Sequence, residues 1–142
     1  MFDPSRDQVR EMFFGAWRKY RAGEPIVGIE SLALDVILQH PEYHGVLSLP
    51  GKFREKDYTD ESNPFLHMSL HVALEEQLSI DQPPGIRDAV QQLARRHDSM
   101  HDARHDVMDC LAEVIWNAQR HGAAFDNDAY MDCIRGRKAS SP

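Results

Sequence analysis

Histidines are over-represented in this 142-residue chain, and their spacing suits chemistry on helices. Four pairs of the eight histidines are separated by four residues: His40/His44, His67/His71, His97/His101 and His101/His105. This spacing places two side chains one above the other on the same helical face. Random placement would give about 0.4 such pairs, so the spacing is an excess. Two imidazoles one turn apart can direct nitrogen lone pairs at one metal ion.

Two of these pairs border the apolar face of the helix that is predicted to carry them. At about 100° per residue, His67 and His71 lie about 60° and 100° from the centre of their apolar stripe. By the same count, His101 and His105 lie about 80° and 120° from theirs, in the same rotational sense. If the two helices pack side by side in antiparallel orientation, both pairs border the same side of the interface. We therefore expect all four imidazoles to converge on one metal ion.

Carboxylates close to the histidines could complete a metal site. The candidates are Glu75, one turn beyond His71; Asp98, three residues before His101; and Glu42, between His40 and His44. Each could be a ligand or could orient an imidazole through a hydrogen bond. The spacing of acid and imidazole is similar to the Glu-x-x-His ligands of di-iron bundles, although the acid here is the shorter Asp. A mixture of imidazole and carboxylate suits several metals, and we expect iron or zinc.

The same histidines also permit interpretations that need no metal. A histidine at the border of a helix can pair with a neighbouring carboxylate, face solvent or act in acid–base catalysis. For His40 and His44 a structural role is favoured, because Pro41 interrupts the helix on which the spacing argument depends. His121 is expected in the last turn of its helix, where a positive charge interacts favourably with the helix dipole.

The histidines must be positioned by helices, because apolar residues recur at steps of three and four while strand signals are scarce. We expect an all-α fold, an antiparallel helical bundle of about four main helices with short additional helices. The main and short helices are expected at residues 4–22, 27–39, 41–47, 64–80, 86–97, 100–121 and 127–134. Residues 48–62 contain Pro50-Gly51 and seven charged side chains. This stretch is expected to be a mobile, solvated loop that could act as a lid.

Length and charge narrow the class of protein. A chain of 142 residues suits one domain, expected over residues 1–136, with a disordered tail at 137–142. The formal charge of -7 disfavours binding to nucleic acid and to anionic membranes. The chain contains no apolar run of membrane-spanning length and no signal-peptide pattern, so a cytoplasmic location is expected. Cys110 and Cys133 are expected to be buried, unpaired small hydrophobic residues.

Several segments of the chain have a distinctive sequence. They are His-Pro-Glu-Tyr-His at 40–44, Asn-Pro-Phe-Leu-His-Met-Ser-Leu-His at 63–71, the stretch 76–87, and His-Asp-Ala-Arg-His at 101–105 followed by Cys110, Trp116 and 118–120. Together they resemble a bacterial family catalogued as domain of unknown function 1841. The resemblance implies a whole domain of a cytosolic bacterial protein, and it supplies no activity or site residue.

Two functions of different classes are compatible with these observations. The first is a helical bundle that binds a metal ion through the paired His-x-x-x-His series and acts as a metal-dependent oxidoreductase or hydrolase. The second is a non-catalytic helical interaction module, whose histidines are structural or respond to pH. The sequence indicates no particular protein partner, small-molecule substrate or oligomeric state.

Overall fold

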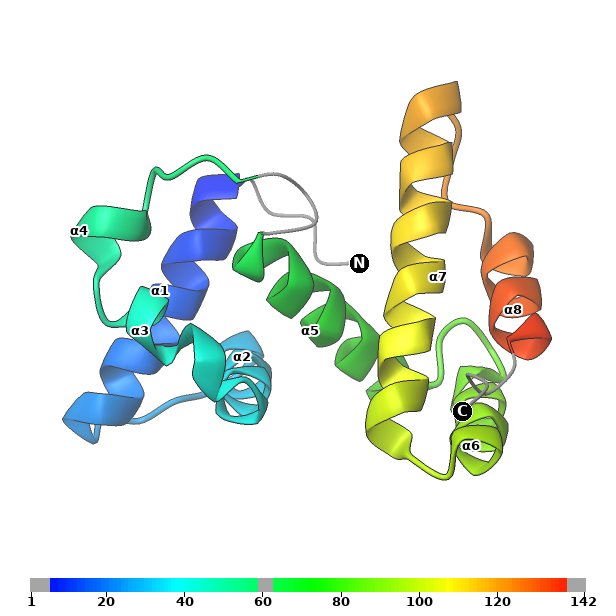
Figure 1. Ribbon diagram of the computed structural model, residues 1–142, viewed down its shortest axis with the longest axis horizontal. Helices are drawn as coiled ribbons and strands as arrows, with labels where there is room; N and C mark the ends of the chain where they lie inside the picture. Colours follow the sequence, from blue (N-terminus) through cyan, green and yellow to red (C-terminus); the bar gives the residue numbers. More distant parts are fainter. Residues whose placement is uncertain (1–5, 59–62, 138–142) are drawn as a thin grey trace. The chain divides into compact units, whose positions relative to one another are not determined.

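Helices joined by short connections make up the part of the chain that the computed structural model describes, residues 6–58 and 63–137 (Figure 1). These residues form eight α-helices and one 3-10 helix, and they contain no strand, which confirms the all-α class. Within the same residues, no helix is both long enough and apolar enough to cross a membrane.

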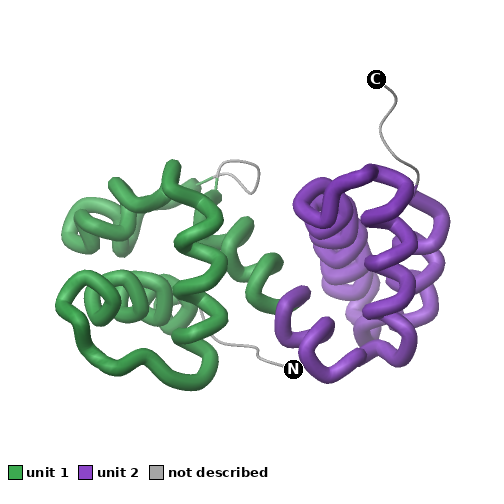
Figure 2. Tube along the Cα trace, turned by 90° about the horizontal axis from the view of Figure 1, so that it is seen from below, with its two compact units in different colours: residues 1–73 green, residues 74–142 purple. Residues whose placement is uncertain are grey.

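The chain divides into two compact units, Met1–Ala73 and Leu74–Pro142, with the boundary inside helix α5 (Figure 2). A single domain over residues 1–136 stays a prediction. Of the expected tail, residues 138–142 lie outside the described residues.

Unit 1 is built around two packed helices, α1 and α2. Its elements are α1 (Arg6–Ala22), α2 (Ile29–Gln39), η1 (Pro41–Tyr43), α3 (His44–Leu47), α4 (Pro50–Phe53) and the first part of α5 (Pro64–Ile80). Its core contains the buried residues Phe13, Phe14, Ala16, Trp17, Ala33, Val36, Ile37, Leu47, Phe65, Met68 and Val72. The rings of Phe14 and Phe65 lie 5.4 Å apart, so α5 closes the core that α1 and α2 begin.

A buried arginine ties α1 to the residues that follow α4. Arg10 is only 2% exposed, which is unusual for an arginine. Its Nη1 donates hydrogen bonds to the carbonyl oxygens of Phe53, Arg54 and Lys56, at 3.4, 3.0 and 2.7 Å. Its guanidinium also lies over the ring of Tyr58. These contacts satisfy the buried charge and fix the course of residues 53–58.

Part of the stretch expected to be a loop is helical in the described residues 48–58. Pro50–Phe53 forms one helical turn with Pro50 at its first position, where a missing N–H costs nothing. The expectation of an irregular loop is therefore wrong at these residues. Pro50-Gly51 is a turn signal by itself, whereas the contact of this segment with the distant Arg10 depends on tertiary packing. Residues 59–62 lie outside the described residues, and mobility of the segment stays a prediction.

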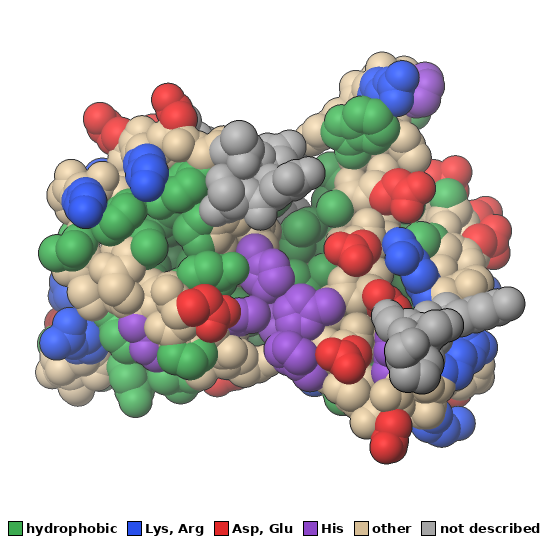
Figure 3. Space-filling view, in the orientation of Figure 1, with side chains coloured by type: hydrophobic (Ala, Val, Ile, Leu, Met, Phe, Trp, Pro, Cys, Tyr) green, Lys and Arg blue, Asp and Glu red, His purple; other side chains and the backbone are tan. Residues whose placement is uncertain are grey.

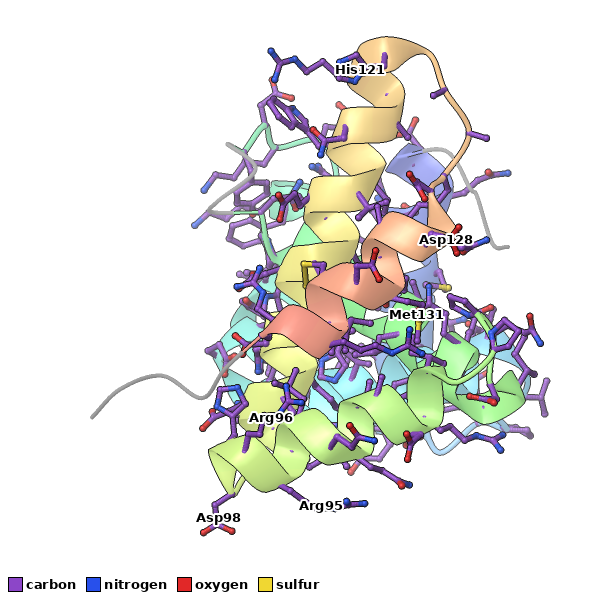
Figure 4. The ribbon with its side chains drawn as sticks, turned by 90° about the vertical axis from the view of Figure 1, so that its right-hand side faces the viewer. Arg95, Arg96, Asp98, His121, Asp128 and Met131 are labelled. Carbon is purple, nitrogen blue, oxygen red and sulfur yellow. A yellow bond between two sulfur atoms is a disulfide. The ribbon has the colours of Figure 1, made fainter. Side chains whose placement is uncertain are left out.

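Unit 2 packs three helices against one another after the second part of α5. They are α6 (Ile86–His97), α7 (Met100–His121) and α8 (Asn127–Gly136). Figure 4 shows α8 lying against α7. The helices share an apolar core that contains Ile86, Ala89, Val90, Leu93, Val107, Met108, Leu111, Val114, Tyr130, Met131 and Ile134.

The ends of the unit 2 helices are set by capping residues. The Ser99 hydroxyl accepts a hydrogen bond from the backbone N–H of Asp102 at 3.1 Å. The Asp126 carboxylate accepts one from the N–H of Ala129 at 3.0 Å. Gly122 ends α7 at a φ of 60°, a left-handed conformation that glycine adopts without strain. Local side-chain chemistry therefore sets where these helices begin and end.

The corner between α5 and α6 is held by an aspartate and an arginine. The Asp81 carboxylate accepts hydrogen bonds from the backbone N–H groups of Arg87 and Gly85, at 3.0 and 3.3 Å. These bonds hold the pKa of Asp81 below its ordinary value. The Arg87 side chain donates in turn to the carbonyl oxygens of Leu78 and Ser79, both at 2.6 Å. The start of α6 is thus fastened to the end of α5.

A disulfide links α7 to α8. Cys110 and Cys133 are bonded, with their Cα atoms 5.9 Å apart, and the bond is drawn in yellow in Figure 4. The expectation that the two cysteines are unpaired is therefore wrong. The chain reverses direction after Gly122, so α8 returns along α7 and brings together two residues that are 23 positions apart.

Tyr130 is fully buried in unit 2, and its hydroxyl donates a hydrogen bond to the Gln77 side-chain oxygen at 2.7 Å. Burial raises the pKa of this phenol far above its ordinary value of about 10. An unfolded chain would release the proton above that pH, whereas the folded chain keeps it. Tyr130 therefore lowers the stability of the folded state as the pH rises above about 10.

We predict that the free energy of unfolding falls above pH 10 by up to about 1.4 kcal/mol per pH unit from this residue. Denaturant unfolding followed by circular dichroism across pH 8 to 11 measures the slope. Tyr130→Phe should make the slope shallower, whereas Tyr20→Phe, at an exposed tyrosine, should leave it unchanged. Equal slopes in the two variants would contradict the prediction.

Candidate metal centre

Three histidines of unit 1 gather where the end of α2 meets the first part of α5. They are His40, His67 and His71, and one nitrogen of each lies within 4.8 Å of the others. His71 is 0% exposed and His40 5%, while His67 is half-buried. The rings meet edge to face, with the centroid of His40 4.8 Å from that of His67 and 5.6 Å from that of His71. This cluster could hold a metal ion.

Helix α5 supplies two of the three imidazoles. Asn63 begins the helix, because its side-chain oxygen accepts hydrogen bonds from the N–H groups of Phe65 and Leu66, at 2.9 and 3.1 Å. Pro64 occupies the first helical position, as the sequence predicts. From this start, the four-residue spacing places His67 and His71 on one face.

Pro41 determines the position of the third imidazole. Proline has no N–H to continue a helix and restricts the residue before it, so α2 ends at Gln39. His40 then adopts a non-helical conformation with φ of -127° and ψ of 68°. Its side chain consequently joins the cluster with the two α5 histidines. The proline that weakens the helical-pair argument is therefore what brings His40 to the site.

His44 is held by a backbone hydrogen bond and by stacking on an aromatic ring. Its Nε2 donates to the carbonyl oxygen of Ile37 at 2.9 Å, and its ring stacks on Trp17 with centroids 4.3 Å apart. The structural interpretation that the sequence favours for His40 and His44 thus fits His44, whereas His40 belongs to the histidine cluster.

Glu42 is hydrogen-bonded to His40. The Nδ1 of His40 lies 2.6 Å from a carboxylate oxygen of Glu42. Since a carboxylate only accepts, Nδ1 carries the proton and the lone pair of the neutral ring is on Nε2. Burial acts to raise the pKa of Glu42, but hydrogen bonds from His40 and from its own backbone outweigh it and lower the pKa. A carboxylate that fixes a histidine in this way is typical of the partners of metal ligands.

Tyr43 flanks the cluster and was missed by the sequence analysis. Its ring stacks on His40 with centroids 5.4 Å apart and lies 6.0 Å from the ring of His67. Burial and the nearby charge of Glu42 raise the pKa of its hydroxyl. The available signal was its place between two histidines in the distinctive segment 40–44.

The second predicted histidine pair lies on α7 in unit 2. Nδ1 of His105 donates to the carbonyl oxygen of His101 at 2.9 Å, and the two ring centroids are 4.2 Å apart. The pair therefore shares one helical face, as its spacing predicts. Acidic side chains are scattered over the face of unit 2 that includes α7 (Figure 3). A shared ion between this pair and the α5 histidines stays a prediction.

The remaining acidic candidates also belong to unit 2. The Glu75 carboxylate lies 2.8 Å from Nε of Arg104, an ion pair between α5 and α7. Asp98 is exposed at the end of α6, with a φ of 53°. His97 donates to Asp106 at 2.6 Å, so at least one histidine of this region pairs with a carboxylate. A role for Glu75 or Asp98 as a metal ligand stays a prediction.

The chain was compared with protein families, curated proteins and solved structures. A family model described as a domain of unknown function, DUF1841, matches residues 5–136. No curated protein and no solved structure was found to match the chain. The matched range includes the three clustered histidines together with Glu42 and Tyr43. The resemblance seen in the sequence is confirmed, and the chain belongs to the DUF1841 family.

Proposed function

We propose that this protein binds a divalent transition-metal ion through His40, His67 and His71. The observation that carries the proposal is the approach of one nitrogen of each ring to within 4.8 Å of the others in a largely buried place. A tetrahedral zinc ion with bonds of about 2.1 Å holds its nitrogen ligands about 3.4 Å apart. Small side-chain rotations therefore bring the three nitrogens to a common ion.

The ligand set favours zinc or ferrous iron. Imidazole is a common ligand of both metals, whereas calcium and magnesium prefer oxygen. Three protonated imidazoles this close together would repel one another, while three neutral ones offer lone pairs to a cation. The fixed proton on Nδ1 of His40 leaves Nε2 as the nitrogen that faces an ion.

The number of imidazole ligands supports a catalytic role for the metal site. Three histidine ligands leave a position on a tetrahedral ion for water, substrate or a further side chain, as in catalytic zinc sites. A bound metal there supplies an activated water for hydrolysis or a centre for redox chemistry. We therefore propose a metal-dependent hydrolase or oxidoreductase. In either case, Glu42 orients His40 through the hydrogen bond to its Nδ1. The cytoplasmic location stays a prediction.

Removal of one imidazole should abolish tight metal binding. We expect untagged, chelator-treated protein to take up one Zn²⁺ or Fe²⁺ per chain. We expect His71→Ala to bind it at least about a hundredfold more weakly, because a direct ligand is lost. Isothermal titration calorimetry and elemental analysis after dialysis measure affinity and stoichiometry.

The matched control is His121→Ala, which removes an exposed histidine at the end of α7. It should bind metal as the wild type does. At a hundred times the dissociation constant, metal should stabilise the wild type by about 2.7 kcal/mol, and a chelator should remove this increment. Metal-free protein with a chelator-insensitive melting temperature would instead support the non-catalytic interaction module.

Glu42 should influence affinity through His40. Glu42→Ala is expected to weaken metal binding by about tenfold, because His40 loses the partner that fixes its tautomer. Glu42→Gln should weaken it less, since the amide oxygen can still accept the hydrogen bond. Asp35→Ala, at an exposed acidic residue of α2, controls for the change in net charge. Equal affinities of Glu42→Ala and Asp35→Ala would exclude an orienting role.

The α7 pair tests the prediction of a four-histidine site. If His101 and His105 are ligands of the same ion, the double variant His101→Ala/His105→Ala should bind metal at least about tenfold more weakly at unchanged stoichiometry. The spacing of the four histidines in the sequence predicts this loss, whereas a site made by His40, His67 and His71 alone predicts an unchanged affinity. Competition with a zinc-binding dye measures it. An unchanged affinity would confine the site to the histidines of unit 1.

A further inference from the structure

The disulfide of unit 2 joins two sulfur atoms in different surroundings. Cys110 is 0% exposed on the inner face of α7, whereas Cys133 on α8 is half-buried. A thiolate that opens a disulfide must reach one of its two sulfurs, and access helps decide which one is attacked. Accessibility therefore favours attack at Cys133, with the sulfur of Cys110 as the leaving group.

A guanidinium group lies beside the sulfur that would leave. Nε of Arg137 donates a hydrogen bond to Sγ of Cys110 at 3.4 Å. Nη1 of Arg96 donates to the carbonyl oxygen of Arg137 at 2.8 Å and holds this part of the backbone near the end of α6. A nearby positive charge stabilises a thiolate, and a more stable thiolate leaves faster. The buried sulfur thus has a partner for the negative charge that reduction would place on it.

We propose that the Cys110–Cys133 bond is a site of reversible thiol–disulfide exchange, attacked by a dithiol reductant at Cys133 while Arg137 stabilises the departing thiolate of Cys110. This inference rests on residues of unit 2 and does not depend on the proposed metal site of unit 1.

The exchange takes place in two balanced steps. A thiolate of the reductant forms a bond to Sγ of Cys133 as the original disulfide breaks, and Cys110 takes the electron pair. The second thiolate of the reductant then attacks the reductant's own sulfur in the mixed disulfide and releases Cys133 as a thiolate. The reductant becomes a disulfide after supplying two electrons, and its two protons end on Cys110 and Cys133.

Other contacts keep α8 in place when the bond opens. Tyr130, Met131 and Ile134 remain buried against the unit 2 core. Nη1 of Arg96 also donates to the carbonyl oxygen of Arg135 at 3.2 Å. These attachments hold the two thiols close to each other after reduction, so an oxidant can restore the same bond.

The position of attack can be read from the full-length wild-type protein. Oxidised protein is treated briefly with reduced glutathione, quenched with N-ethylmaleimide and digested with trypsin, which places the cysteines in separate peptides, 105–120 and 121–135. We expect glutathione on Cys133 and maleimide on Cys110. Glutathione on Cys110, an even distribution, or two free thiols before any treatment would overturn the proposal.

Arginine variants test the stabilisation of the leaving group. Dithiothreitol should reduce the disulfide of Arg137→Gln at least about threefold more slowly than that of the wild type. Arg137→Lys should keep most of the wild-type rate of reduction. Arg135→Gln is the matched control, because it removes a charge from α8 two residues earlier. Circular dichroism confirms that each variant is folded. Equal rates for Arg137→Gln and Arg135→Gln would overturn the assigned role of Arg137.

Discussion

The missing N–H of one proline determines how the histidine cluster of unit 1 is assembled. Pro41 ends α2, and the residue before it must leave the helical conformation. His40 consequently lies beside the α5 histidines. Of the two residues after Pro41, Glu42 accepts a hydrogen bond from the ring of His40, and Tyr43 stacks on it. In an uninterrupted helix, His40 would stack with His44 one turn away. The break thus converts a local pair into a cluster that combines distant parts of the chain.

Features set by neighbouring residues were predictable from the sequence. Apolar periodicity located the main helices, and the starts expected at residues 64, 100 and 127 are those of α5, α7 and α8. The side chains of Asn63, Ser99 and Asp126 cap these starts. The placement of His67 and His71 on one face followed from helical geometry alone. Each of these features depends on interactions within about one turn of helix, so a single sequence carries the information.

Features set by packing were not predictable in the same way. The approach of His40 to α5 depends on how two helices pack, and the Arg10 contacts join residues 43 to 46 positions apart. The disulfide between Cys110 and Cys133 depends on α8 returning along α7, which their spacing of 23 residues does not indicate. In each case, the tertiary fold determines which distant residue the side chain contacts.

The buried arginine of α1 has a consequence for the order in which the chain can be completed. During synthesis, Arg10 leaves the ribosome well before Lys56, whose carbonyl oxygen accepts one of its hydrogen bonds. Until that residue has emerged, water must solvate the guanidinium, because burying an unpartnered charge is costly. Unit 1 therefore cannot reach its final packing from its first helices alone. Its amino-terminal helix settles only after the segment beyond α4 has been made.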